Sequence, residues 1–316
     1  MDTQNKTPAV TAVVVTYQSA AALETTLPAT RRCYQAGLMD CIFVDNDSKD
    51  NTSQLLAAES AWADVILTKK NNGFGRGCNI GLAKVATKYT LFLNPDAQIE
   101  PEAVAQMVAF LEANPTVGIV GPATLCGDGP TKRYQGTGVL PTPWSIVKRV
   151  MPLVPFKSDL VPILPGTAPF KTEWVCGAIL LIRTELAQRL NGFDPRFFLY
   201  WEEMDLCRRA ATMGFDTWAM GTAQAQHICG ASSTVDDTQI FGCIGKYFYE
   251  SRYYYMIKHH GWLAATLADV SEFALLAVRT LVDVCQGKGS ARLRPRLQTS
   301  LLSQPKPLTN TDAYAQ

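Results

Sequence analysis

The chain has 316 residues, of which 47% are hydrophobic, and a formal net charge of +1 at pH 7. This length and this hydrophobic fraction are enough for one large domain with an appendage, or for two domains. A net charge so close to zero gives no strong overall field, so a nucleic-acid partner is not expected.

Four short apolar runs near the N-terminus each end in polar or glycine-rich residues. They are Thr11–Tyr17, Cys41–Asp45, Val65–Thr68 and Leu91–Leu93, and the segments between them are long enough for helices. This alternation predicts an α/β fold with an open, mostly parallel sheet and helices on both faces. In such a sheet, ligands bind outside the carboxyl ends of the strands. The residues expected to face this crevice are Tyr17, Asp45, Asn71 and Asp96.

The alternation continues after this region and is then interrupted. A helix is predicted over 100–114 and a strand over 117–120, whereas the Gly- and Pro-rich stretch 121–172 is expected to lack regular structure. Further strands are predicted over 174–182, 215–220 and 223–227, and further helices over 184–190 and 202–213.

The composition changes again from Ile244 onwards. An aromatic and basic segment precedes Leu263–Cys285, which is apolar with helical spacing but contains four charged residues, so a membrane-spanning helix is not expected. Two alternatives stand: an amphipathic helix on a bilayer surface, or a helix packed on the main domain. We therefore expect a helical, membrane-associating or docked segment over 244–290 and a flexible tail over 291–316.

The cysteines and the N-terminus bear on the compartment. The nine cysteines are scattered without a C-x-x-C pair, and several lie in apolar segments. This usage is typical of buried free thiols in a reducing cytoplasm. The first ten residues contain no signal-peptide pattern, so a cytoplasmic location is expected.

The ends of the first two predicted strands carry residues suited to a nucleotide. The ring of Tyr17, which follows Thr16, can stack on a nucleobase or can cap the core. The carboxylate of Asp45 can accept hydrogen bonds from a base imide or a ribose hydroxyl. Helix capping explains Ser48 and Asp50 well, but it is a poor explanation for Asp45, which still belongs to the apolar strand.

Two further segments are suited to a diphosphate and a cation. The glycine-rich segment Asn71–Gly81 allows backbone N–H groups to approach an anion, with Arg76 adding charge, although a plain loop is the alternative. Its spacing matches neither a Walker loop nor G-x-G-x-x-G. Pro95 has a fixed φ and restricts Asn94 to an extended conformation, so the direction of the Asp96 side chain is constrained. An acid here can hold a divalent cation on a diphosphate, or it can simply start a helix.

A third group of residues is suited to acid–base chemistry. Glu202, Glu203 and Asp205 follow an aromatic run at a predicted helix start. Acids in the first turn of a helix interact favourably with the helix dipole. Acids that emerge beside apolar and aromatic side chains can instead have a raised carboxyl pKa, which suits a general base. His227 ends a predicted strand, where it is either structural or part of a metal site.

Seven motifs, taken in order over about residues 10–260, resemble those of the inverting glycosyltransferases of family 2, which adopt the GT-A fold. The bacterial rhamnosyltransferases of surface polysaccharide synthesis are the nearest likeness. The motifs read VVVTYQS, VDNDSKDNT, NNGFGRGCNIG, FLNPDA, WVCGAILLIR, GFDPRFFLYWEEMDLCRRA and HICGASS. The resemblance implies a Rossmann-like nucleotide-binding domain over 1–243.

The resemblance also implies roles for individual residues. The base is Glu203, which stands where the family has the Asp of Glu-Asp, and Glu202 is the reserve candidate. Asp96 and His227 hold Mg²⁺ or Mn²⁺. The donor side is formed by Thr16, Tyr17, Asp45, Asn72, Gly73, Arg76, Asn94 and Asp96. The acceptor side is formed by Trp174, Cys176, Gly177 and Asp205.

The implied reaction moves rhamnose from dTDP-rhamnose, or a hexose from a UDP-sugar, to a hydroxyl of a glycan. The implied acceptor is linked to polyprenyl diphosphate at the cytoplasmic face of the inner membrane. One alternative is a nucleotidyltransferase, but TYQSAAALE follows the first strand where a glycine-rich, basic loop is needed. Another is a non-catalytic subunit of a membrane glycan-assembly complex, against which the retained acids argue.

Overall fold

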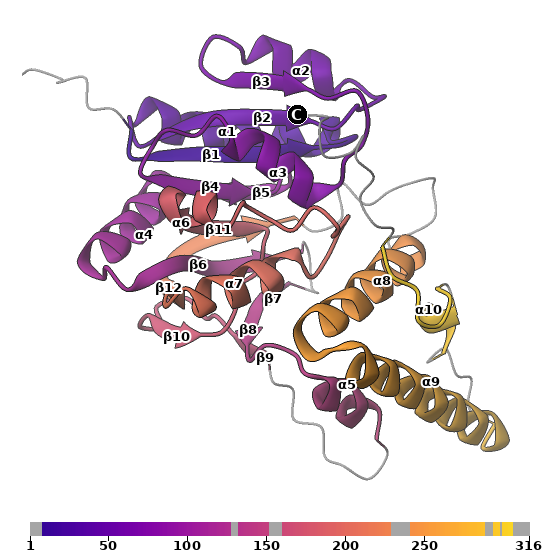
Figure 1. Ribbon diagram of the computed structural model, residues 1–316. Helices are drawn as coiled ribbons and strands as arrows, with labels where there is room; N and C mark the ends of the chain where they lie inside the picture. Colours follow the sequence, from indigo (N-terminus) through magenta and orange to yellow (C-terminus); the bar gives the residue numbers. More distant parts are fainter. Residues whose placement is uncertain are drawn as a thin grey trace, which may run out of the picture. The chain divides into compact units, whose positions relative to one another are not determined.

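A computed structural model describes residues 8–127, 132–151, 160–228, 241–287, 293–297 and 299–305. The chain forms two compact units. The first, here called the sheet unit, comprises residues 1–139, 160–194 and 203–232. The second, the helical unit, comprises residues 140–159, 195–202 and 233–316. Figure 1 shows the helices and strands of both.

The sheet unit is built on a mixed, ten-stranded sheet. Its main path runs β10 (Phe170–Thr172), β12 (Asp216–His227), β6 (Val117–Cys126), β11 (Ile179–Arg183), β4 (Tyr89–Leu93), β1 (Val10–Thr16), β2 (Met39–Asp45), β3 (Asp64–Leu67). The strands from β4 to β3 are parallel, whereas β11 runs antiparallel between β4 and β6. The predicted open sheet is confirmed.

Helices flank this sheet because its central strands are apolar on both faces. Every residue of β1 and of β4 is buried, so neither face of these strands meets water. The flanking helices are α1 (Ala20–Gln35), α2 (Thr52–Ala58), α3 (Phe74–Leu82), α4 (Pro101–Ala113), α6 (Thr184–Arg189) and α7 (Glu202–Thr212). Since β1 pairs in parallel with both β2 and β4, the carboxyl ends of these three strands lie at one edge.

The Gly- and Pro-rich stretch is more regular than predicted. Strand β6 continues to Cys126, and β7 (Arg133–Tyr134) pairs with its end. Strands β8 (Gly136–Gly138) and β9 (Leu160–Pro162) form a separate two-stranded sheet. Pairing with distant partners stabilises these short strands, and such pairing leaves little trace in the local pattern. The prediction of irregular structure was therefore wrong for these residues.

Two other differences follow from strand pairing. The strands predicted over 215–220 and 223–227 are one strand, β12, whose pairing with β6 shifts register between Met220 and Gln224. A further short strand, β5 (Ala97–Ile99), pairs antiparallel with the end of β12. This last pairing decides the geometry of the candidate site.

The helical unit contains α5 (Pro143–Val150), α8 (Phe241–His260), α9 (Trp262–Cys285) and α10 (Arg294–Leu297). Helix α9 packs against both α5 and α8. The helix predicted over Leu263–Cys285 is confirmed by α9. Within the part of the chain that the structure describes, no helix is both long enough and apolar enough to cross a membrane.

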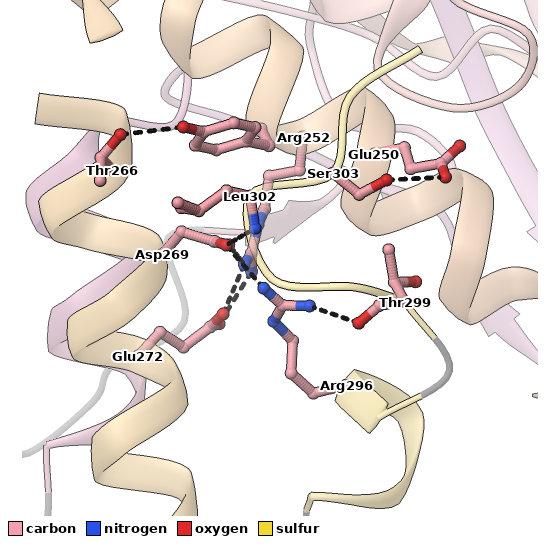
Figure 2. Close-up of polar contacts among 10 residues, drawn as sticks. Glu250, Arg252, Thr266, Asp269, Glu272, Arg296, Thr299, Leu302 and Ser303 are labelled. Carbon is pink, nitrogen blue, oxygen red and sulfur yellow. Dashed lines mark hydrogen bonds and ion pairs between the residues drawn. The ribbon is translucent and has the colours of Figure 1, made fainter. Parts of the chain in front are cut away.

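A cluster of four buried charges joins three helices of this unit. The guanidinium of Arg252 on α8 donates to Asp269 (2.9 Å) and to Glu272 (2.8 Å), both on α9. Arg296 on α10 donates to the second oxygen of Asp269 at 2.6 Å. Figure 2 shows the two acids pointing toward the two guanidinium groups.

This cluster corrects the predicted flexible tail in part. Arg296 is 1% exposed, and the backbone N–H of Leu302 also donates to Asp269, at 3.2 Å. Arg296 and the backbone at Leu302 are therefore held against α9 by a distant acid, whereas Leu297 is 64% exposed. Residues 306–316 lie outside the described residues, and the domain boundaries at 243 and 290 stay predictions.

The cysteine pattern agrees with the interpretation made from the sequence. Cys33, Cys41, Cys78, Cys126 and Cys207 are buried. Burial raises the pKa of the Cys33 and Cys207 thiols to about 12, so both are protonated near neutral pH.

Candidate functional site

The central pair of the site is Asp96 and His227, which are 131 residues apart in the sequence. Strand β5 begins directly after Asp96, and its pairing with β12 sets Ala97 opposite His227. The backbone N–H of Ile228 donates to the Asp96 carbonyl at 2.9 Å and closes this contact. The Nε2 atom of His227 then lies 3.0 Å from Oδ1 of Asp96. The two side chains are 13% and 5% exposed.

The turn that carries Asp96 is held on both sides. The N–H of Asn94 donates to the Ala178 carbonyl at 2.8 Å, and Thr26 Oγ1 donates to the Pro95 carbonyl at 2.6 Å. The Nδ2 atom of Asn94 lies 3.4 Å from Nε2 of His227. Asp96 is therefore fixed in orientation, and Thr26 is a contributor that the sequence did not indicate.

The pair fits a divalent cation in its chemistry. A carboxylate oxygen and an imidazole nitrogen are both ligands for Mg²⁺ or Mn²⁺. Over the described ranges, no group of three or more His, Cys, Asp or Glu side chains is placed to hold a metal. A cation bound by Asp96 and His227 would complete its shell with water and with oxygens of a diphosphate, as Mg²⁺ does in phosphate sites.

Two residues behind the imidazole were missed by sequence reasoning. Gln135 Nε2 lies 3.2 Å from His227 Nδ1, and Cys126 Sγ lies 3.9 Å from the same nitrogen. A partner on Nδ1 fixes the ring orientation and selects which nitrogen faces Asp96. Gln135 belongs to the stretch that was expected to be irregular, where no motif marked it.

The donor side begins with a hydrogen-bonded turn after β2. Asp45, which is 3% exposed, accepts from Thr16 Oγ1 at 3.0 Å and from the N–H of Ser48 at 3.2 Å. The hydroxyl of Ser48 donates to the same carboxylate. Asp45 therefore stabilises the turn after β2 and does not cap a helix, since α2 begins only at Thr52. Tyr17 is half-buried at the end of β1.

The residues before α3 also bond to one another. The N–H of Gly73 donates to Asn71 Oδ1 at 2.9 Å, and Asn72 Nδ2 donates to the Lys70 carbonyl at 3.1 Å. Asn46 Nδ2 donates to the Gly73 carbonyl at 3.0 Å and so joins this turn to the end of β2. Gly73 has φ +80°, which glycine adopts without strain.

Most glycines of this segment lie within α3 and not in a loop. A Cβ at Gly77 would lie 2.6 Å from Val15 Cγ1, and one at Gly81 would lie 2.4 Å from Val13 Cγ1. These glycines therefore let α3 pack closely on β1. Within Asn71–Gly81, the prediction of an anion-binding turn therefore applies to Gly73 and the first turn of α3, where Arg76 is half-buried.

Glu203 is positioned by a glycine next to the Asp96 turn. A Cβ built on Gly177 would lie 3.2 Å from Glu203 Cβ and 3.6 Å from its Cγ. Gly177 adjoins Ala178, whose carbonyl accepts from Asn94. The sheet unit thus connects Glu203 to Asp96 through a short series of contacts. Glu203 is half-buried, whereas Glu202 is 5% exposed, which favours Glu203 as the residue that a substrate reaches.

The backbone just before α7 is strained. Tyr200 and Trp201 have φ +68° and +73°, values that bulky residues with a Cβ rarely adopt. Such conformations persist where the surrounding structure fixes them, and they concentrate at functional sites. Here they set the start of the helix that carries Glu203.

We expect Gly177→Ala to lower turnover by about tenfold to a hundredfold, because the new methyl group displaces Glu203. Steady-state kinetics and the thermal midpoint of the variant test this. A fall in kcat with an unchanged midpoint would support the contact, whereas unchanged kcat would show that Gly177 does not position Glu203.

The residues predicted for the acceptor side, Trp174, Cys176 and Gly177, are buried or half-buried. Trp174 is 7% exposed, and its carbonyl accepts from Thr137 Oγ1, while Cys176 is half-buried beside Gly177. Their contact with an acceptor stays a prediction.

Asp205, also predicted for the acceptor side, is buried in an ion pair. Its side chain has no exposed surface and pairs with Arg209 Nε at 2.7 Å. Arg209 also donates to the carbonyls of Leu190 and Gly192, both at 2.8 Å. Asp205 therefore helps to anchor α7 to the turn at Leu190–Gly192 through Arg209, and a role on the acceptor side stays a prediction.

The sheet and the polar edge at its strand ends define the class of protein. The mannosyltransferase PcManGT from Pyrobaculum calidifontis, solved with GDP-Man and Mn²⁺, has a similar structure. The TM-score is 0.55 at 15% sequence identity, covering 89% of this chain and 79% of that one. The chain therefore has the GT-A fold of nucleotide-sugar-dependent glycosyltransferases.

Residues 11–175 match glycosyl transferase family 2, and the chain belongs to this family. It is similar to an N-acetylglucosaminyl-diphospho-decaprenol L-rhamnosyltransferase of Mycobacterium tuberculosis, with 24% identity over 248 residues, 72% of this chain and 77% of the relative. It is also similar to the rhamnosyltransferase WbbL of Escherichia coli, with 27% identity over 160 residues, 45% of this chain and 55% of WbbL. The chain is therefore a glycosyltransferase enzyme.

Proposed function

We propose that this glycosyltransferase moves a sugar from a nucleoside diphosphate to a hydroxyl of a lipid-linked glycan, with inversion, during bacterial surface polysaccharide synthesis. The observation that carries the proposal is the arrangement of Asp96, His227 and Glu203 around the carboxyl end of β4. Asp96 and His227 are 3.0 Å apart, and Glu203 packs on the segment that bonds to the Asp96 turn.

The proposed donor side uses the strand ends. Tyr17 offers a ring on which a base can stack, and the first turn of α3, with Gly73, Asn72 and Arg76, receives a phosphate. The hydroxyls of Thr16 and Ser48 both donate to the Asp45 carboxylate, so Thr16 contributes to the donor side by holding Asp45 in place. Asn94 lies beside His227 and holds the turn.

Asp96 and His227 would hold the cation. When bound, the cation neutralises charge on the departing diphosphate. The enzyme's own residues do the rest: Glu203 accepts the proton of the acceptor hydroxyl as that oxygen forms a bond to the anomeric carbon. The bond from this carbon to the diphosphate breaks at the same time, and its electron pair leaves with the diphosphate. One displacement with one base inverts the carbon.

The relatives favour a particular donor and acceptor. Two of them are rhamnosyltransferases, and the mycobacterial one is named for a decaprenol-diphosphate glycan. We therefore propose dTDP-rhamnose as the first donor to test and a UDP-hexose as the second, with a polyprenyl-diphosphate-linked acceptor. Such an acceptor places the enzyme at the cytoplasmic face of the membrane.

A donor panel tests the function. The purified chain should release nucleoside diphosphate from one sugar nucleotide of the panel, and the release should rise with the matching acceptor. EDTA should abolish it, and Mn²⁺ or Mg²⁺ should restore it. Release that EDTA leaves unchanged would overturn the cation assignment. Release of pyrophosphate from a nucleoside triphosphate, with no activity on sugar nucleotides, would favour a nucleotidyltransferase.

A further inference from the structure

Helix α9 places its charged residues on the side that faces the rest of the helical unit. At 3.6 residues per turn, its four charged positions fall on one side: Asp269, Glu272, Arg279 and Asp283. Asp269 and Glu272 are 4% and 5% exposed, and Figure 2 shows both turned toward the buried arginines. Arg279 donates to the Val150 carbonyl of α5 at 3.1 Å.

The opposite side of α9 is apolar. We call it the apolar stripe, formed by Leu263, Leu267, Val270, Ala274, Val278 and Leu281. Leu263, Leu267 and Leu281 are 63%, 59% and 64% exposed. At 1.5 Å per residue the stripe is about 27 Å long. It contains no charged side chain.

This distribution reverses that of a helix at a water-exposed surface, which keeps its charges outside and its apolar residues inside. A continuous exposed apolar surface of this kind marks a site that contacts something other than water. Asp269, Glu272 and Arg279 are paired inside the helical unit, so the outer side of α9 can contact an apolar medium.

The neighbouring residues favour a bilayer as that medium. Trp262 precedes the stripe and is 63% exposed, and Trp144 on α5, which packs against α9, is 61% exposed. Lys148 follows Trp144 by one helical turn on α5, which contains no acid. Tryptophan beside basic residues is typical of helices that lie in the bilayer interface. Protein interfaces usually add hydrogen bonds, for which the stripe has no side-chain donor or acceptor.

We propose that the apolar stripe, with Trp144, Trp262 and Lys148, docks this enzyme in the plane of an anionic lipid bilayer. The helix lies on the bilayer without crossing it. The inference rests on the proposed membrane-linked acceptor for its role, but docking itself requires no donor, cation or acceptor.

Co-sedimentation of the full chain with lipid vesicles tests the proposal. The chain should bind vesicles of phosphatidylcholine with phosphatidylglycerol more tightly than vesicles of phosphatidylcholine alone. Leu263, Leu267 and Leu281, all replaced by Gln, should weaken binding by roughly a hundredfold, because three exposed leucines no longer enter the bilayer. Lys148→Gln should reduce the preference for anionic vesicles.

A matched control replaces three exposed apolar residues of the sheet unit by Gln: Leu67, Val139 and Leu160, which are 61%, 59% and 51% exposed. This variant should bind as the unchanged chain does. Equal vesicle binding by both triple variants would overturn the proposal, as would no binding by the unchanged chain. A dimer in light scattering that only the stripe variant breaks would instead make the stripe an interface between copies.

A second measurement separates docking from chemistry. Donor hydrolysis in solution should be the same in the stripe variant and in the unchanged chain. If docking persists but no sugar nucleotide is used, the proposed function fails while the docking proposal stands. If hydrolysis persists without vesicle binding by the unchanged chain, the docking proposal fails alone.

Discussion

Glu203→Gln is expected to lower turnover by about 10²–10⁴-fold, which is the usual contribution of a positioned general base. Glutamine keeps the size of the side chain but cannot accept the acceptor proton, so the loss should fall on kcat. Donor binding should persist, because Glu203 lies on α7, whereas the proposed donor residues lie after β1, β2 and β4 and at the start of α3. Single-turnover kinetics and calorimetric titration of the nucleotide measure the two effects separately.

Two further variants make this test specific. Glu203→Asp shortens the side chain by one carbon to the residue that the family motif has at this position, and it should retain more activity than the Gln variant. Glu202→Gln changes a residue that is 5% exposed and should cost less turnover than Glu203→Gln. If Glu202→Gln is the more damaging of the two, the base is Glu202.

Asp269→Ala is expected to destabilise the helical unit by about 3–5 kcal/mol, the usual cost of removing one partner from a buried ion pair. The carboxylate accepts from Arg252 and Arg296, whose side chains are 6% and 1% exposed. Without it, Arg252 keeps Glu272 as a carboxylate partner, whereas Arg296 keeps the Thr299 carbonyl and loses its carboxylate partner. Urea unfolding and hydrogen exchange of α8, α9 and α10 measure the loss.

The exposed pair between Arg32 and Glu100 provides the control. Both side chains are about half exposed, at 51% and 49%, so Arg32→Gln should leave the unfolding midpoint unchanged. An equally small effect of Asp269→Ala would show that the buried cluster does not hold the helical unit together. Vesicle binding by the Asp269 variant should fall as well, if α9 loses its packing.

The four parallel strands of the sheet from β4 to β3 could be predicted from the sequence because each contains an apolar run. β1, β2, β3 and β4 lie within a few residues of their predicted limits. The short strands β7, β8 and β9 could not be predicted, since each depends on a partner strand and carries no local signal. The same holds for α10, where buried Arg296 pairs with the distant Asp269.

In the candidate site, too, residues with a local sequence signal could be predicted, whereas contacts between distant segments could not. Asp96 was predicted from its place after an apolar strand and a proline. Its contact with His227 follows from the pairing of β5 with β12, a pairing of residues that are far apart in the sequence. Asp205 could not be assigned from the sequence, because an acid in a first helical turn looks the same whether it faces a substrate or a buried arginine. Gln135 was missed because no motif includes it.

The most direct test of the central claim is a crystal structure of the enzyme with Mn²⁺ and the nucleoside diphosphate of its donor. We predict an anomalous Mn²⁺ peak within ligand distance of the Asp96 carboxylate, the diphosphate on that ion, and the base near Tyr17. A cation or a diphosphate bound away from Asp96 would contradict the site described above.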